Sequence, residues 1–77
     1  MEAEMEEYAL ELGRDALMTF DLERDMARFI KRAFDKRFGP TWQCVVGQQY
    51  GTFISYRSLH FISFSLAQME FLLFKTD

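Results

Sequence analysis

The sequence predicts an α+β domain in which two N-terminal helices pack on a four-stranded antiparallel sheet. Apolar residues recur every three to four positions in the first half of the chain, and they alternate with period two after Pro40. The predicted strands are short and joined by tight turns, which leaves no room for the crossover helices that parallel strands need. We expect a single domain over 1–77, with helices at about 2–19 and 22–38 and the sheet at about 41–76.

The first helix is indicated by an apolar stripe that comprises Met5, Tyr8, Ala9, Leu12 and Ala16. Glutamates in its first turn suit the positive end of the helix dipole. Gly13 lies inside this helix, where glycine costs about 1 kcal/mol relative to alanine. Gly13 is either a place of close packing or a tolerated glycine, and the sequence leaves both interpretations open.

The second helix has the clearest stripe, which comprises Leu22, Met26, Phe29, Ile30, Ala33, Phe34 and Phe38. Asp21 is a suitable N-cap for this helix. Gly39-Pro40 is a stop signal, because glycine accepts a left-handed cap and proline cannot continue the helix.

Four strands are expected after this stop, at about 42–46, 52–56, 60–66 and 71–75. The turns between them are expected at 47–51, 57–59 and 67–70. The strand at 50–56 has no charge or proline, so it could be an exposed edge that accepts a foreign strand by backbone hydrogen bonding. An ordinary inner strand is the alternative interpretation.

Charge is distributed unevenly along the chain. Residues 1–38 carry ten acids and seven bases, whereas 39–77 carry only Arg57, Glu70, Lys75 and Asp77. Because the two helices can cover only one face of the sheet, the other face would present few charges to water. Such a surface is a poor solvent face and a suitable interface, and a second copy related by a two-fold axis is its simplest partner.

Composition argues against several classes of function. The net charge of −3 is unfavourable for contacts with phosphate backbones, so no nucleic acid partner is expected. Cys44 and His60 are the only cysteine and histidine, and a closed metal site needs four ligands, so no metal or other cofactor is expected. A catalytic Cys44–His60 pair would lack a third residue to orient it, so we do not expect an enzyme.

Two further expectations concern location. The chain begins with an acidic run, and no apolar core follows a basic start, so we expect no signal peptide. No apolar stretch approaches the ~20 residues that a membrane span needs, so no direct membrane insertion is expected. Together with a single cysteine, these features favour a reducing, cytoplasmic location.

The segment from Phe34 to Asp77 resembles the C-terminal half of the eight-kilodalton light chains of cytoplasmic dynein. Its most specific parts read FDKRFGPTWQC, GTF and LLFK in this sequence. The likeness continues more weakly back to about Leu22 and faintly through the first helix.

This resemblance implies a strand-exchanged homodimer, in which a strand at 50–56 pairs with the sheet of the other subunit. Two identical grooves would lie at the dimer interface, each between this strand and the second helix of the other subunit. Extended segments of other proteins, including the dynein intermediate chain, would add there as antiparallel strands. The implied protein is a non-catalytic, cytoplasmic, cytoskeleton-associated light chain of the dynein microtubule motor, and a hub that brings two copies of a partner together.

The resemblance also assigns residues. Those matching the peptide groove are Glu23, Arg24, Gln48, Gln49, Tyr50, Gly51, Thr52, Phe53, Ile54, Ser55, Tyr56, Phe61, Ser63 and Ser65. Those matching the dimer interface are Gln43, Tyr50, Phe53, Ser55 and Tyr56. Unpaired amides at the start of the second helix would bind a ligand glutamine, and Gly51 would allow close backbone approach. For Phe61, core and groove are equally good interpretations.

Four positions depart from the family pattern. Tyr56 replaces a frequent histidine and could partly refill the groove. Ser63 and Ser65 stand where tyrosine is common, which would widen the groove and remove roughly 1.5–3 kcal/mol of apolar burial per side chain. Gln43 replaces a histidine usual at the dimer interface, and because glutamine does not titrate we expect a dimer that persists at pH 5. The two serines support an alternative function, a divergent structural dimer or scaffold subunit with a weakened or altered groove, whereas the Glu23-Arg24 pair favours peptide binding.

Overall fold

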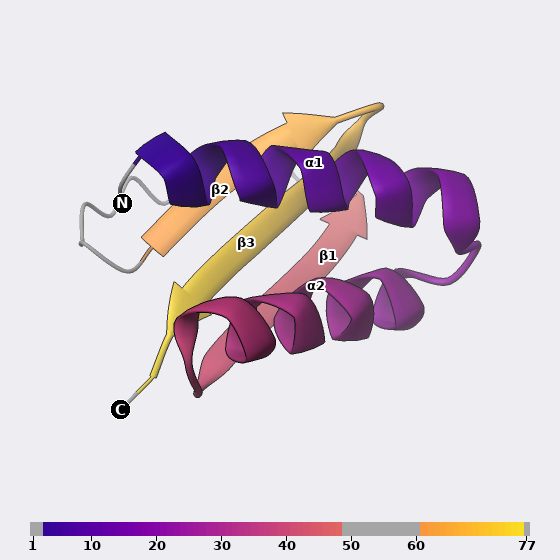
Figure 1. The fold of residues 1–77 in the computed structure, drawn as a ribbon. Helices are drawn as coiled ribbons and strands as arrows, with labels where there is room; N and C mark the ends of the chain where they lie inside the picture. Colours follow the sequence, from indigo (N-terminus) through magenta and orange to yellow (C-terminus); the bar gives the residue numbers. More distant parts are fainter. Residues whose placement is uncertain (1–2, 49–60, 77) are drawn as a thin grey trace.

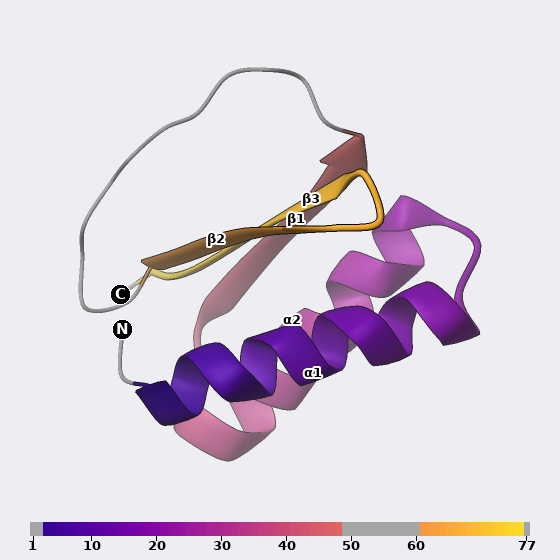
Figure 2. The same cartoon turned by 90° about the horizontal axis from the view of Figure 1, so that it is seen from above.

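The computed structural model describes residues 3–48 and 61–76, in which two helices cover one face of a three-stranded antiparallel sheet (Figure 1; Figure 2). The elements are α1 (Ala3–Thr19), α2 (Glu23–Phe38), β1 (Trp42–Gln48), β2 (Phe61–Leu66) and β3 (Met69–Lys75). The strand order is β1-β3-β2, so β3 is the central strand. The predicted α+β class is confirmed, and the strand predicted at 52–56 lies outside the described residues.

Helix α1 packs on β2 at Gly13. A Cβ atom placed on Gly13 would lie 2.9 Å from Cε2 of Phe64 and 3.0 Å from Cδ1 of Leu66, both shorter than ordinary van der Waals contacts. Of the two interpretations of this glycine, close packing is therefore the correct one. Ala9 and Ala16, which are fully buried, give the same face of α1 a small profile.

Helix α2 begins at Glu23, one residue later than a cap at Asp21 would place its start. The carbonyl oxygen of Leu22 accepts hydrogen bonds from the amides of Asp25 and Met26, each at 3.1 Å, which makes Leu22 the N-cap residue. Leu22 has no side-chain acceptor, and Asp21 lies one position too early to supply one. The prediction of an Asp21 cap was therefore wrong.

Helix α2 ends at Phe38, as the Gly39-Pro40 stop signal predicted. Gly39 has the positive φ expected of a glycine cap, at 83°, but its ψ of 153° is extended and not left-handed helical. Its amide donates to the carbonyl oxygen of Asp35 at 3.1 Å. The chain thus turns sharply away from α2 and enters β1 within three residues.

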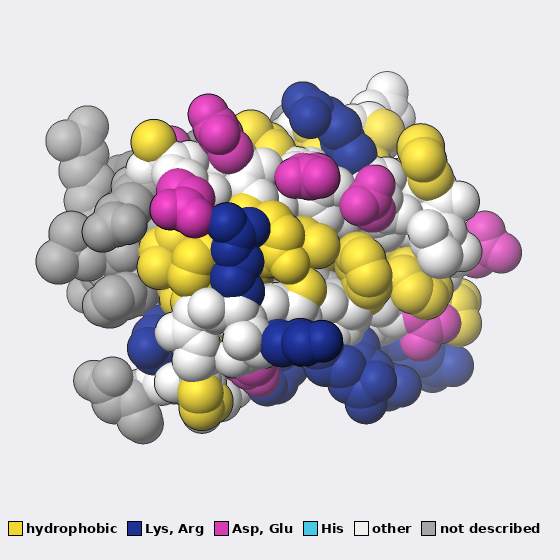
Figure 3. Space-filling model, in the orientation of Figure 1, with side chains coloured by type: hydrophobic (Ala, Val, Ile, Leu, Met, Phe, Trp, Pro, Cys, Tyr) yellow, Lys and Arg dark blue, Asp and Glu magenta, His cyan; other side chains and the backbone are white. Residues whose placement is uncertain are grey.

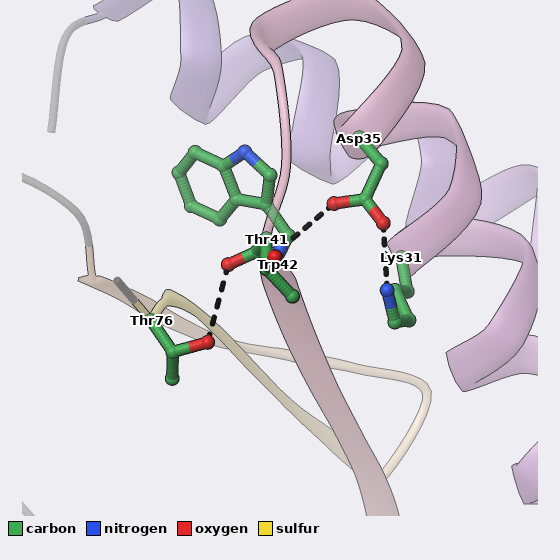
Figure 4. A network of polar contacts seen from close by, with 5 residues as sticks. All are labelled: Lys31, Asp35, Thr41, Trp42 and Thr76. Carbon is green, nitrogen blue, oxygen red and sulfur yellow. Dashed lines mark hydrogen bonds and ion pairs between the residues drawn. The ribbon is translucent and has the colours of Figure 1, made fainter.

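Asp35 joins the end of α2 to the start of β1 (Figure 4). Its Oδ1 accepts a hydrogen bond from the Trp42 amide at 2.7 Å, and its Oδ2 accepts one from Lys31 Nζ at 2.6 Å. The Thr76 amide donates to the carbonyl oxygen of Thr41 at 2.8 Å, so the same corner also holds the end of β3. The hydrogen bond from Lys31 lowers the pKa of Asp35, partial burial opposes this shift, and the Trp42 amide adds to it.

Replacing Asp35 by alanine is expected to lower the free energy of unfolding by about 1–3 kcal/mol at pH 7, because the Trp42 amide loses its acceptor. Since the folded-state pKa of Asp35 is lowered, its contribution is present above pH 4 and is lost as the pH falls through that pKa. Urea unfolding should therefore show a smaller difference in the free energy of unfolding between the wild type and Asp35→Ala at pH 3 than at pH 7. The control Lys31→Ala, which removes a partly exposed ion pair and leaves the acceptor of the Trp42 amide in place, should cost less than about 1 kcal/mol. Equal stability of Asp35→Ala and the wild type at pH 7 would contradict this role.

The β2–β3 hairpin is tighter than the sequence predicted. Ala67 and Gln68 form a two-residue turn with φ values of 51° and 66°, and Leu66 pairs directly with Met69. Positive φ at both turn residues suits the twist of the flanking strands, as in a type I′ turn. The strand expected to begin at Phe71 therefore begins two residues earlier, at Met69.

The register divides the sheet into two faces, because residues opposite one another in antiparallel strands project to the same side. The face under the helices carries Trp42, Cys44, Val46, Ile62, Phe64, Leu66, Met69, Phe71 and Leu73. Phe34 of α2 packs edge-to-face on Trp42, with ring centroids 4.9 Å apart, and both side chains are fully buried. This layer between helices and sheet is the core of the described fold.

Candidate functional site

The face of the sheet opposite the helices, called here the outer face, is built from three rows of residues. The rows are Gln43–Phe74–Phe61, Val45–Leu72–Ser63 and Gly47–Glu70–Ser65. Both described helices lie on the other side of the sheet (Figure 2). The outer face is thus the part of the sheet that neither helix covers.

The outer face is poor in charge and partly apolar. Val45 is 46% exposed, and the Phe61 and Phe74 rings stack with centroids 6.4 Å apart. Glu70 is the only ionisable side chain among the described residues of this face. The charge-poor face that the sequence predicted is therefore present, on the side of the sheet where it was expected.

Glu70 is the outer-face residue that sequence reasoning missed. The sequence shows Glu70 as one of the few charges of the second half and does not indicate which face of the sheet carries it. The register places it between Gly47 and Ser65, where it is only 9% exposed. The position follows from the two-residue turn at Ala67-Gln68, which fixes the face of every β3 residue.

Comparison with known proteins identifies the family. The dynein light chain type 1 family matches residues 1–76. The chain belongs to the dynein light chain family. A relative from Emericella nidulans, named "Dynein light chain, cytoplasmic", is 43% identical over 77 residues, which cover 100% of this chain and 82% of the relative.

Solved structures support the same fold for this dynein light chain. The dynein light chain-like domain of a Fasciola hepatica calcium binding protein superposes with a TM-score of 0.82 and is 23% identical. A mercury derivative of that domain gives a TM-score of 0.78 at 24% identity. Each comparison covers 100% of this chain and 84% of the other.

The predicted groove residues that the structure describes lie on both sides of the sheet. Ser63 and Ser65 are on the outer face of β2, whereas Glu23 and Arg24 are exposed in the first turn of α2, in the helix layer. Within one chain the sheet separates these two pairs. Neither face of the sheet in one chain therefore presents both pairs.

The remaining predicted residues are placed as follows. Gln43 lies on the outer face, partly buried and paired with Phe74, and Phe61 occupies the same row. Gln48 is exposed at the end of β1 and lines a hollow with the β2–β3 turn. Predicted residues outside the described part are Gln49, Tyr50, Gly51, Thr52, Phe53, Ile54, Ser55 and Tyr56.

Cys44 points into the core beside Trp42 and Val46. Burial raises the pKa of its thiol from 9.0 to about 12, because the thiolate would lose its hydration there. His60 lies outside the described residues, and residues 3–48 and 61–76 contain no group of three or more possible metal ligands. No helix in these ranges is long and apolar enough to cross a membrane.

Cys44 should accordingly be unreactive in the folded protein. Because the thiolate is the nucleophile, a pKa raised from 9.0 to about 12 lowers the reactive fraction about a thousandfold at pH 8. We expect Ellman's reagent to label folded Cys44 at least about a hundred times more slowly than the urea-unfolded chain. Labelling at equal rates in the two states would show that the thiol is not buried as described.

Proposed function

We propose that this dynein light chain is a non-catalytic homodimer that binds extended peptide segments by strand addition. In this proposal it acts in the cytoplasm, associated with the dynein motor on microtubules, and as a hub for other proteins with short extended motifs. The name of the Emericella nidulans relative supports the cytoplasmic location and the dynein association. The dynein intermediate chain is the proposed partner within the motor.

The observation that carries this proposal is the outer face of the sheet. It exposes Val45 and has one carboxylate among nine described positions, and both helices lie behind it. Burying apolar surface stabilises association by roughly 25 cal/mol per Å². A two-fold contact between two such faces would bury the same apolar rows on both copies.

Strand addition is supported by the edges of the sheet. In the order β1-β3-β2, each outer strand pairs with only one neighbour among the described residues. Backbone groups along such an edge can pair with an added strand, and nearby side chains then give selectivity. A two-fold dimer would place two equivalent grooves beside the α2 helices of opposite subunits, with Glu23 and Arg24 at their ends.

Calorimetric titration with a peptide containing a Thr-Gln-Thr core tests the proposal. We expect saturable binding of one peptide per chain. A Ser63→Arg variant, which places a long charged side chain on the outer face of β2, should weaken binding at least about tenfold. The matched control Thr19→Arg adds the same charge at an exposed position of α1 and should leave the affinity unchanged. A folded dimer that gives no heat with this peptide would contradict peptide binding.

The alternative function is a structural dimer or scaffold subunit of the motor with a weakened groove. Ser63 and Ser65 favour it, because their small side chains leave the outer face of β2 with little apolar surface. Under this alternative the dimer forms and the peptide does not bind. The same titration therefore decides between the two functions.

A further inference from the structure

The outer surface of α1 carries a ladder of carboxylates. Glu7, Glu11 and Asp15 are exposed and recur every four residues, so they form one stripe with a repeat of about 6 Å. Met18 belongs to the same stripe, because it follows Glu7 by about three helical turns. Its side chain is 83% exposed, more than any other large apolar side chain of the described residues.

The outer surface of α2 carries the opposite charge around a hollow, called here the basic hollow. This hollow, of about 430 Å³, is lined by Phe20, Asp25, Arg28, Phe29, Arg32, Ala33 and Lys36. The three basic residues are exposed and also recur every four positions, so their ladder has the same repeat as the carboxylates of α1. Phe20 and Phe29, with ring centroids 5.5 Å apart, give the hollow its aromatic part.

The two ladders do not neutralise each other within one chain. In residues 3–48 and 61–76 the ion pairs are Lys31–Asp35 and Arg37–Glu4, and none involves a member of either ladder. Figure 3 shows mainly acidic side chains along α1, mainly basic side chains along α2 and between them an apolar band that one basic side chain crosses. Each ladder is thus available to a partner of opposite charge.

We propose that two copies of this chain associate through their helix layers, with α1 of each copy against the basic hollow on α2 of the other. Helices α1 and α2 lie side by side and run in roughly opposite directions (Figure 1). Consider a two-fold axis that runs parallel to the apolar band, between the helix layers of two copies. The rotation places α1 of each copy over α2 of the other and keeps the direction of each helix along the band. Each of the two equivalent contacts is therefore an antiparallel pair of α1 and α2.

This arrangement brings unlike features into register. The Met18 end of α1 meets the start of α2, where the thioether can enter the hollow and contact Phe20 and Phe29. The carboxylates that precede Met18 then follow the basic ladder along α2. Each stripe also contains one residue of the opposite charge, Arg14 on α1 and Asp25 on α2. Three charges of the ladder's own sign thus remain for each opposite charge.

A second copy is favoured over an unrelated acidic segment, because α1 of this chain has the features that the basic hollow requires. Its carboxylates have the same repeat as the basic ladder, it runs in the required direction, and it carries Met18 as an exposed apolar side chain. The contact uses the side of the molecule opposite the outer face of the sheet (Figure 2). It therefore goes beyond the proposed strand-exchanged dimer and does not depend on it. Where both contacts form, dimers would join into larger assemblies.

Sedimentation velocity at about 50 mM and about 500 mM salt tests this proposal, since screening weakens contacts between exposed charges. At low salt the wild-type protein should associate beyond the dimer formed through the outer faces, in a concentration-dependent way, and this additional association should be lost at high salt. The variants Glu11→Lys/Asp15→Lys and Arg32→Glu/Lys36→Glu should each weaken this association at least about tenfold, because like charges then face each other. An equimolar mixture of the two variants should associate again, because both contacts regain opposite charges.

The control variant Glu6→Lys/Asp21→Lys changes the net charge as Glu11→Lys/Asp15→Lys does, but at exposed positions outside the ladders, and it should associate like the wild type. Three results would overturn the proposal: no salt-dependent association of the wild type, no salt-dependent association of the mixed variants, or salt-dependent association that survives Glu11→Lys/Asp15→Lys. The last result would show that the carboxylates of α1 do not form the contact. None of these results depends on peptide binding, which the calorimetric titration tests separately.

Discussion

Replacing Leu72 by glutamate is expected to weaken self-association through the sheet by about a hundredfold or more. Leu72 lies at the centre of the outer face, between Val45 and Ser63 on the neighbouring strands. In a two-fold contact between outer faces, each copy would bury an unpaired carboxylate, at a cost of several kcal/mol. Sedimentation equilibrium at high salt, where the helix-layer contact is screened, measures the change.

The matched control is Leu22→Glu, which replaces a half-exposed leucine in the helix layer by the same residue. It should change the dissociation constant of the sheet-mediated dimer less than about threefold. Unchanged association of a folded Leu72→Glu protein would contradict the assignment of the outer face as the interface.

Replacing Phe34 by alanine is expected to lower the free energy of unfolding by about 3–5 kcal/mol. Phe34 is fully buried, and its ring contacts Trp42, Tyr8 and Phe38. A domain of this size has little stability in reserve, so the variant should be largely unfolded at 37 °C. Urea unfolding followed by the fluorescence of Trp42, the only tryptophan, reports on this contact directly.

Phe29→Ala is the control for this prediction, because it removes a ring from the same helix at a partly buried position on the outer side of α2. It should cost clearly less than Phe34→Ala. Similar losses for the two variants would mean that the core does not lie between α2 and β1.

The helices were predictable because their stripes are long and regular. The buried residues Met26, Ile30 and Phe34 all belong to the predicted stripe of α2. The position of the cap was not predictable in the same way. Asp21 is the better capping residue, but the backbone of Leu22 accepts the first helical hydrogen bonds, and packing of the α1–α2 connection decides between adjacent positions.

The start of β3 could not be read from the sequence, because Ala67 and Gln68 are not the glycine and asparagine that usually mark a type I′ turn. The placement of Glu70 on the outer face depends on that turn and was missed with it. Gly13 is a related case, since only its distances to Phe64 and Leu66 distinguish close packing from tolerance.

The sequence predicted that the sheet has an uncovered face, but it predicted only some of the residues on that face. A deficit of charge in the second half indicated an uncovered sheet face, and the outer face carries the predicted Gln43, Phe61, Ser63 and Ser65. That these residues and Glu23 lie on opposite sides of the sheet follows from the packing of the helices. The basic hollow on α2 could not be recognised from charge counts, because it depends on Phe20 packing beside Phe29.

The central claim is that the outer face of the sheet is covered by a second copy of the chain. Sedimentation equilibrium of the wild-type protein at neutral pH and about 500 mM salt tests it most directly, since the contact between charged helix layers is then screened. We predict a mass twice that of the 9.2 kDa chain down to low micromolar concentration. A folded species with the mass of one chain across this range would contradict the account.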